Sequence, residues 1–219
     1  CSTRGRRLMD PYDIANDPYV NKQSGILRNK LGLHDALTLE TVETQLVSAQ
    51  VLIILNESIP ARFDSHLLRS LHWRLFHQLY DWAGEYRTVE ISKGSSRFAM
   101  SEHIPQQVDI VLADLENKCT SWKQRNCTIP EVVAHFYSEL NAIHPFREGN
   151  GRTIRLFLLL LAIQHGWFVD WKQMTPEENI TASQAAFYGN EALLKEIVSR
   201  ISSVLPEESR RQSSQSDAA

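Results

Sequence analysis

Apolar residues recur every three to four positions along most of the chain, which predicts a protein built largely of helices. One such stretch runs through Leu39, Val42, Leu46, Ala49 and Ile53. We expect helices over residues 37–55, 64–80, 104–122, 128–143 and 152–165, then a helix from Thr175, and a last helix from Asn190 to about Val204.

Local signals mark where several of these helices begin and end. Asp64 is a predicted N-cap, because a short acidic side chain accepts hydrogen bonds from the first turn. Thr128-Ile-Pro-Glu131 and Thr175-Pro-Glu-Glu178 are capping-box patterns. Residues 152–165 are apolar on nearly all sides and Gly166 follows them, so we expect this helix in the middle of a bundle.

One segment breaks the helical period. Residues 88–99 alternate apolar and polar side chains around Lys93-Gly94-Ser95, which predicts a short β-hairpin. A lone hairpin is marginally stable in water, so it should lean on the bundle or on a bound partner. The predicted fold is therefore all-α, a helical bundle with a short β-hairpin flap at about residues 88–100.

The two ends of the chain differ from the middle in composition. Residues 1–23 show no period, and the arginines among them, Arg4, Arg6 and Arg7, are read as part of a solvated N-terminal arm. Residues 206–219 are polar and predicted to be disordered. The folded domain is expected over residues 24–205.

Composition excludes several classes of function. With 219 residues, 42% of them hydrophobic, the chain can bury one core. A net charge of −3 gives no basic surface for direct nucleic-acid binding. The longest apolar run, Leu156–Ile163, is far below the roughly 20 residues that span a bilayer. Three cysteines without Cys-x-x-Cys spacing are typical of reduced thiols. The eight histidines form no His-Glu-x-x-His pattern, so we expect no structural zinc. No apolar leader with a cleavage site opens the chain, so we expect a cytoplasmic protein.

The candidate chemistry lies in residues 144–155, His-Pro-Phe-Arg-Glu-Gly-Asn-Gly-Arg-Thr-Ile-Arg. Pro145 disfavours the α conformation at His144, so the preceding helix should stop there. His144 then lies at a corner between a helix and a loop, where its imidazole can act as a general base near neutral pH. We predict His144 as the catalytic residue.

The loop that follows His144 has the features of an anion site. Gly149-Asn150-Gly151 can adopt positive φ angles and bring backbone N–H groups close to a ligand. A helix begins directly afterwards, and its unpaired N–H groups and positive dipole end face the same point.

The charged residues of the loop indicate a polyphosphate with a metal. Arg152 and Arg155 are three residues apart and share one face of the first helical turn, with Arg147 nearby. Cations at a helix N-terminus oppose the dipole, and a bound polyphosphate makes the arrangement favourable. Glu148 is predicted to hold Mg²⁺ against phosphate oxygens, or else to pair with an arginine. The loop therefore predicts nucleotidyl or phosphoryl transfer to a hydroxyl.

The same twelve residues resemble the signature of the Fic family, His-x-Phe-x-(Asp/Glu)-Gly-Asn-Gly-Arg-x-x-Arg, at every specified position. Asp81-Trp-Ala-Gly-Glu-Tyr-Arg-Thr88 with Ile91-Ser-Lys-Gly94 resembles the segment that enters the target-docking flap of the family. Tyr188-Gly189-Asn190 with Leu193 resembles its C-terminal helices on the nucleotide side. The resemblance covers roughly residues 10–205.

This resemblance implies an adenylyltransferase that moves AMP from ATP to a protein hydroxyl. His144 would deprotonate the incoming Tyr, Ser or Thr, and Glu148 would hold Mg²⁺ between the α- and β-phosphates. Gly149, Asn150 and Gly151 would form the anion hole, with Asn150 on the α-phosphate, Arg152 on the β-phosphate side and Arg155 on the γ-phosphate. The flap residues Lys93, Gly94, Ser95, Ser96, Arg97 and Phe98 would dock an extended target segment by β-augmentation.

Two alternatives remain open on the same motif. One is a transferase of another group, UMP, phosphocholine or phosphate. Relatives that act as kinases carry lysine or asparagine in place of the second motif glycine, so Gly151 favours AMP transfer. The other is a nucleotide-binding module without activity, in which His144 would have no chemical role.

Many members of the family inhibit themselves with a (Ser/Thr)-x-x-x-Glu-(Gly/Asn) helix, whose glutamate pairs with the second motif arginine. The glutamates followed by Gly or Asn are Glu116, Glu148 and Glu178, and the residues four positions before them are Leu112, His144 and Met174. None fits the pattern. The resemblance therefore implies a toxin restrained by a small antitoxin protein that supplies this helix, with DNA gyrase and topoisomerase IV as candidate targets.

Overall fold

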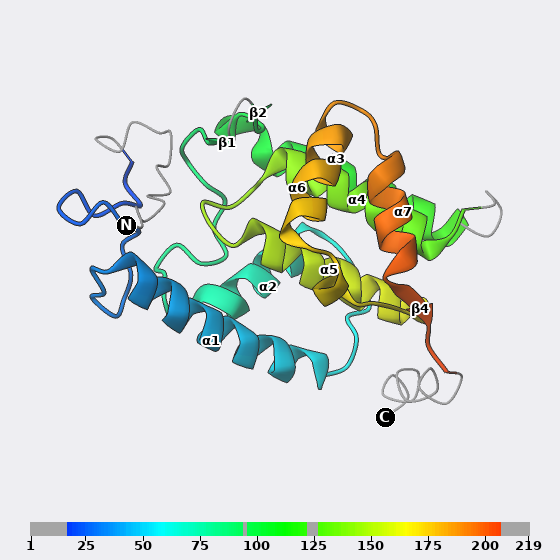
Figure 1. The fold of residues 1–219 in the computed structure, drawn as a ribbon, viewed down its shortest axis with the longest axis horizontal. Coiled ribbons are helices and arrows are strands. Elements are labelled where there is room, and N and C mark those ends of the chain that lie inside the picture. Colours follow the sequence, from blue (N-terminus) through cyan, green and yellow to red (C-terminus); the bar gives the residue numbers. More distant parts are fainter. Residues whose placement is uncertain (1–16, 94–95, 122–126, 207–219) are drawn as a thin grey trace, which may run out of the picture.

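The computed structural model describes residues 17–93, 96–121 and 127–206, and within them the chain is a helical bundle with a two-stranded flap (Figure 1). The predicted disordered tail falls on residues outside this range, except for Pro206, as do Arg4, Arg6 and Arg7 and the flap residues Gly94 and Ser95. The helices are α1 (Ala36–Leu55), α2 (Ser65–Phe76), α3 (Ile104–Ser121), α4 (Ile129–Ile143), α5 (Asn150–Gln164), α6 (Pro176–Phe187) and α7 (Ala192–Arg200), with short 3-10 turns at Ser101–His103 and Trp171–Gln173.

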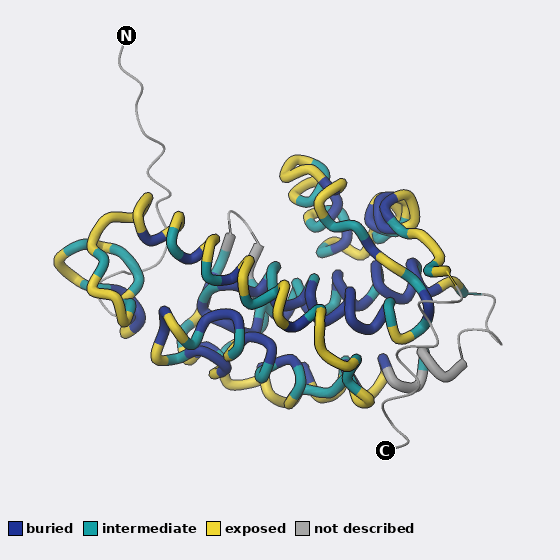
Figure 2. The backbone as a smooth tube through the Cα atoms, turned by 90° about the horizontal axis from the view of Figure 1, so that it is seen from below, coloured by how far each residue is buried: buried dark blue, intermediate teal, exposed yellow. Residues whose placement is uncertain are grey.

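The helix α5 occupies the centre of the bundle, as its composition predicts. All seven residues from Leu156 to Ala162 are buried. The helix packs against α4 on one side and α2 on another, and α3, α6 and α7 gather around α4 (Figure 1). Figure 2 shows the buried backbone concentrated along these central helices. A rigid, fully packed α5 fixes the position of its own N-terminus, where the predicted loop lies.

The helix ends follow the local signals in most places. Asp64 accepts a hydrogen bond from the Leu67 N–H and caps α2. Both capping boxes are formed, at the start of α4 and at the start of α6. Gly166 has the positive φ of 77° expected after the C-terminus of α5.

Two helix ends were predicted wrongly. The second helix ends at Phe76 rather than Tyr80, because the Leu79 and Tyr80 N–H groups both bond to the Phe76 carbonyl and close a turn. The last helix ends at Arg200 instead of Val204. Residues Ser202–Val204 form strand β4, which pairs antiparallel with β3 (Trp167–Val169) in a small sheet that the helical pattern did not reveal.

The flap is present as predicted. Strands β1 (Ser92–Lys93) and β2 (Ser96–Arg97) pair antiparallel, with Ser92 opposite Arg97 and Lys93 opposite Ser96. The all-α class with a short β-hairpin flap is therefore confirmed.

The described part of the predicted N-terminal arm packs on the domain. Tyr19 and Val20 are buried, and Val20 makes an isolated antiparallel bridge with Leu27. Asp17 accepts hydrogen bonds from the Arg147 guanidinium at 2.9 and 3.0 Å in a buried ion pair. The arm is thus linked to the loop between α4 and α5 by this ion pair.

Helix α1 lies along one side of the bundle on α2, with Leu39, Val47 and Ile54 buried (Figure 1). By length and composition alone it is apolar enough to cross a membrane, which is weak evidence, since core helices of soluble proteins pass the same test. Its inner face also carries the buried acid Glu43.

Candidate active site

The loop between α4 and α5 begins with a strained residue. His144 follows the last residue of α4 and adopts the left-handed conformation, with φ 52° and ψ 64°. It is the one non-glycine residue with positive φ in the described part of the chain, and this conformation is costly for a residue with a Cβ. The predicted helix stop before Pro145 is confirmed, and the surrounding structure must hold His144 in place.

The imidazole of His144 is oriented by two neighbours. Its Nδ1 lies 3.2 Å from the Asn141 carbonyl oxygen, which places the proton on Nδ1 and makes Nε2 the proton-accepting nitrogen. The ring of Phe98, just after the flap strand β2, stacks on the imidazole with centroids 4.0 Å apart. The predicted base and one predicted flap residue therefore meet.

Arg87 links this loop to the flap. Its buried guanidinium donates to the carbonyls of His144 at 2.9 Å and Ile143 at 3.3 Å. The same group donates to Val89 at 2.7 Å and to Ala99, one residue on each stem of the flap. The Arg87 backbone N–H also bonds to the Pro145 carbonyl at 2.9 Å. Arg87 thus joins the end of α4, the loop between α4 and α5, and both flap stems.

The side chain of Asn150 bonds to the backbone of the loop between α4 and α5. Its side-chain oxygen accepts from the Phe146 N–H at 2.8 Å, and its side-chain nitrogen donates to the Phe146 carbonyl at 2.7 Å. Asn150 is buried and both ends of its amide are engaged in this way. A contact between Asn150 and the α-phosphate, as predicted, would use its backbone N–H or the second hydrogen of its side-chain nitrogen.

The two glycines of the loop have different roles. Gly149 has φ 79°, and a Cβ there would lie 2.3 Å from the Phe76 ring, so only glycine fits. Gly151 lies inside the first turn of α5 without positive φ, so the predicted freedom applies to Gly149 alone. A Cβ at Gly151 would lie 3.2 Å from Nη1 of Arg155, so this glycine leaves space for that guanidinium.

The N-terminus of α5 has the properties of an anion site. In the described residues no side chain caps it, and Gly149 as N-cap offers none. The first N–H groups of a helix lack partners within the helix and carry its positive dipole end. Together these features favour a negatively charged ligand at Gly149, Asn150 and Gly151.

The three arginines of the loop differ in their partners. Arg147 pairs with Asp17 of the N-terminal arm. Arg152 bonds to Glu43 of α1, with Nη2 2.5 Å from Oε1. Arg155 makes no ion pair with a carboxylate of the described residues, and its guanidinium lies over Gly151 at the start of α5. Arg155 is thus the arginine most available to a bound anion.

Glu148 has a suitable position for a cation. Its Oε1 accepts from the Gly149 N–H at 2.8 Å and lies 3.5 Å from Nη2 of Arg152, while its side chain is 44% exposed. Carboxylate oxygens are preferred ligands of Mg²⁺, which keeps several waters and binds through one or two carboxylates plus phosphates. The residue present fits the predicted metal role.

His72 supports the loop from α2. Its Nδ1 accepts from the Gly84 N–H at 2.8 Å, so the proton is on Nε2, which donates to the Glu148 carbonyl at 3.0 Å. The ring stacks on Phe146 with centroids 3.8 Å apart. Burial, together with the positive charge of Arg152, lowers the pKa of His72 to about 4. His72 is therefore neutral and structural at physiological pH.

Sequence patterns did not single out the supporting residues, although a signal exists for each. Glu43 falls four residues after Leu39, on the apolar stripe of a predicted helix, where an acid is unusual. His72 lies four residues after Leu68, on the apolar face of α2. Arg87 lies in the segment from Asp81 to Thr88 that resembles the entry to the family's flap, directly before the predicted hairpin. The side chains of Lys93, Ser96 and Arg97 are outside the described structure, so their docking role stays a prediction.

His72 makes stability depend on pH. Its folded pKa is lowered, so the unfolded chain takes up a proton first as pH falls from about 6.5 to about 4. The free energy of unfolding should fall by about 3 kcal/mol over this range through His72 alone. Urea unfolding of wild type and His72→Gln across this range measures it. The variant keeps a hydrogen-bond donor for the Glu148 carbonyl, and its free energy of unfolding should depend less on pH. Equal pH dependence of the two proteins would contradict a lowered pKa of His72.

Arg87→Lys should destabilise the fold by about 2–4 kcal/mol, because an ammonium cannot serve four carbonyls held in a fork geometry. Urea unfolding at neutral pH measures the loss. Arg69→Lys is the matched control: Arg69 also donates to a carbonyl, that of Gly84, but its side chain is 43% exposed. That change should cost less than about 1 kcal/mol. Equal losses of stability in the two variants would show that the four carbonyl contacts of Arg87 contribute no more than the exposed contact of Arg69.

Comparison with known proteins places the chain in a family. A family model described as the Fic/DOC family matches residues 62–162. The protein adenylyltransferase VbhT of Bartonella schoenbuchensis is 33% identical over 192 residues, which is 88% of this chain and 40% of VbhT. "Probable protein adenylyltransferase Fic" of Escherichia coli is 29% identical over 194 residues, covering 89% of this chain and 96% of that protein. The chain thus spans less than half of VbhT and nearly all of the Escherichia coli relative.

Solved structures agree. The BepC effector protein of Bartonella tribocorum, crystallised with AMPPNP, has a TM-score of 0.76 and 26% identity, covering 86% of this chain and 97% of that one. The N-terminal Fic domain of a Bep effector from Bartonella quintana, with bound ADP, has a TM-score of 0.77 and 25% identity, covering 86% and 96%. With the complete motif at residues 144–155 and the matching helical fold, this chain belongs to the Fic/DOC family.

Proposed function

We propose that this chain is an ATP-dependent protein adenylyltransferase, which transfers AMP from ATP to a Tyr, Ser or Thr hydroxyl of a target protein. Relatives named protein adenylyltransferase and the nucleotides bound in similar structures support this function. The observation that carries it is the uncapped N-terminus of α5. His144 begins the loop that leads into this N-terminus. The Arg155 guanidinium lies beside Gly151 in the first turn and has no acidic partner among the described residues.

The chemistry follows from these groups. The target hydroxyl oxygen attacks the α-phosphorus of ATP and forms a new P–O bond. The bond from the α-phosphorus to the oxygen that bridges to the β-phosphate breaks, and pyrophosphate leaves. Nε2 of His144 takes the hydroxyl proton, because Nδ1 is already committed to the Asn141 carbonyl.

The loop holds the rest of the nucleotide. Backbone N–H groups at Asn150 and Gly151 receive the α-phosphate side, where negative charge accumulates during transfer. The Gly149 N–H donates to Oε1 of Glu148 in this structure, so its role in the anion hole requires that the phosphate replace this bond. Arg152 contacts the β-phosphate and Arg155 the γ-phosphate. Glu148 would hold Mg²⁺, which neutralises phosphate charge and favours departure of pyrophosphate when bound.

The protein substrate docks along the flap. A short two-stranded hairpin has unpaired edges, and an extended target segment can add to one of them by β-augmentation. Beside it lies a cavity of about 380 Å³ lined by Phe98, Ile110, Glu139 and Ile143 among others. Because Phe98 also stacks on His144, a target bound here is adjacent to the base.

Transfer of UMP, phosphocholine or phosphate is the alternative on this scaffold. Gly151 favours AMP transfer for a geometric reason as well. A lysine or asparagine at this position would introduce a Cβ 3.2 Å from Nη1 of Arg155, so the guanidinium would have to shift by a few tenths of an ångström. Gly151 therefore lets Arg155 lie beside the start of α5 without this adjustment.

His144→Ala should reduce transfer at least about 100-fold, the usual contribution of a general base. The assay incubates the chain with a host lysate and ATP labelled at either the α- or the γ-position, and mass spectrometry identifies the adduct. Label should enter protein only from the α-position, as AMP. His66→Ala, an exposed histidine on α2, should leave transfer unchanged. An adduct other than AMP, or full activity of His144→Ala, would overturn the proposal.

Regulation is proposed to come from a second protein. No (Ser/Thr)-x-x-x-Glu-(Gly/Asn) pattern occurs in the sequence, and no carboxylate of the described residues pairs with Arg155. A small antitoxin that carries such a helix would place its glutamate on Arg155 and block the γ-phosphate. The chain would then act as a toxin when the antitoxin is missing, with DNA gyrase and topoisomerase IV as its proposed targets.

Expression of this chain alone in a bacterial host should arrest growth, and His144→Ala should abolish the arrest. Purified gyrase and topoisomerase IV, each incubated with the chain and α-labelled ATP, test the proposed targets directly. Active chain that accumulates in the host without any effect on growth would contradict the toxin role, while leaving the transferase activity itself intact.

A further inference from the structure

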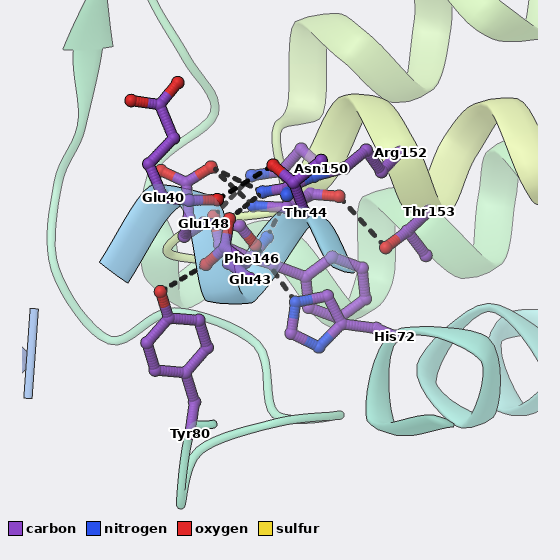
Figure 3. Close-up of polar contacts among 11 residues, drawn as sticks. Glu40, Glu43, Thr44, His72, Tyr80, Phe146, Glu148, Asn150, Arg152 and Thr153 are labelled. Atoms are coloured by element: carbon purple, nitrogen blue, oxygen red, sulfur yellow. Dashed lines mark hydrogen bonds and ion pairs between the residues drawn. The ribbon is translucent and has the colours of Figure 1, made fainter. Parts of the chain in front are cut away.

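The first motif arginine is held by an acid from a distant helix. Oε1 of Glu43, on α1, accepts from Nη2 of Arg152 at 2.5 Å, although the two lie 109 positions apart in the sequence. Oε2 of the same carboxylate accepts from the Tyr80 hydroxyl. Figure 3 shows Glu43 between Tyr80 and Arg152, beside Glu148 and the closed loop of Phe146 and Asn150. The contact joins α1 to the phosphate end of α5.

The Glu43 carboxylate is itself fixed in place. Glu43 is 7% exposed, and Tyr80 is almost completely buried beneath it. Burial and the negative charge of Glu43 raise the pKa of Tyr80, so its hydroxyl keeps the proton that it donates. A buried carboxylate with a hydroxyl on one oxygen and a guanidinium on the other has no room to swing aside. It serves as an anchor rather than a mobile group.

Arg152 is restrained from two further directions. Its guanidinium lies 4.9 Å from the centroid of the Phe76 ring, which supports one face. Nη2 is also 3.5 Å from Glu148, so this nitrogen faces carboxylates. In the described structure no hydrogen bond engages Nε or Nη1 of Arg152. The arginine is therefore held by one nitrogen and one face, and its other donors remain for a ligand at α5.

We infer that Glu43 is a positioning residue for nucleotide binding, which holds Arg152 so that its remaining N–H donors face the β-phosphate. The inference rests on the proposed function, because it takes a nucleotide polyphosphate as the ligand. The anchor also offsets an electrostatic cost: a cation in the first turn of a helix opposes the dipole, and the Glu43 carboxylate compensates for it before any phosphate arrives. A long arginine side chain that is already ordered loses less entropy on binding.

Nucleotides of different phosphate number test this role without any need for catalysis. Isothermal titration with AMP, ADP and a non-hydrolysable ATP analogue gives the affinity of each for wild type and Glu43→Gln. The variant keeps the size of the side chain and removes its charge. Affinity for ADP and the ATP analogue should fall about tenfold, while affinity for AMP, which lacks the β-phosphate, should stay within about twofold. Tyr80→Phe should give a smaller loss of the same pattern.

Matched controls separate this effect from damage to the fold. Glu40→Gln changes an exposed acid one turn earlier on α1 and should bind all three nucleotides as wild type does. Arg152→Ala should show the same selective loss for ADP and the ATP analogue. The double variant Glu43→Gln with Arg152→Ala should lose no more than Arg152→Ala alone, since Glu43 acts through that arginine. Thermal unfolding of each variant checks that it is folded.

Three outcomes would overturn the inference: Glu43→Gln binding ADP and the ATP analogue as tightly as wild type, binding them more tightly, or losing AMP affinity equally. Tighter binding would instead make Glu43 a competitor of the phosphate. Failure of the proposed function has a different signature, namely a wild-type chain that binds ATP and transfers no AMP. The nucleotide affinities of Glu43→Gln test the inference whether or not the wild-type chain transfers AMP.

Discussion

Arg87 is buried, and its guanidinium donates to carbonyls of Val89, Ala99, Ile143 and His144. Burying a charge is costly unless it is fully hydrogen-bonded, and these carbonyls come from the two flap stems and the end of α4. The left-handed backbone of His144 is a second cost, and strained residues persist only where their surroundings over-determine them. Arg87 supplies that restraint, so the position of the base relative to the flap depends on this one side chain.

The phosphate end of α5 depends on core packing in a similar way. Phe76 is fully buried, fills the space beside Gly149 and supports the Arg152 guanidinium on its face. His72, one turn earlier on α2, stacks on Phe146 and bonds to the Glu148 carbonyl. One face of α2 thus shapes the loop without contributing a group that reacts. The loop itself is short, and its geometry is imposed by aromatic rings beneath it.

Local signals in the sequence were enough to predict most of the helices and the charged residues of the loop at residues 144–155. Caps, capping boxes and Pro145 act within a few residues, so the starts of α2, α4 and α6 and the end of α4 followed from them. The β3–β4 pairing and the contacts of Arg87, His72 and Glu43 join residues far apart, with separations of 57, 76 and 109 positions for the last three. No periodicity reports such contacts, because they arise only after the helices pack.

Arg152 and Arg155 are three positions apart on one helix, yet they have different electrostatic surroundings. Arg152 is anchored within the chain by Glu43, which lies on a buried helix face and is itself held by Tyr80. Arg155 has no carboxylate partner in the described part of the chain and lies over a glycine that leaves it space. A partner protein that binds an arginine gains more binding free energy where it does not have to displace an acid of the chain itself. The same asymmetry supports both proposed roles, with Arg152 as a fixed part of the phosphate site and Arg155 as the arginine that the proposed antitoxin would occupy.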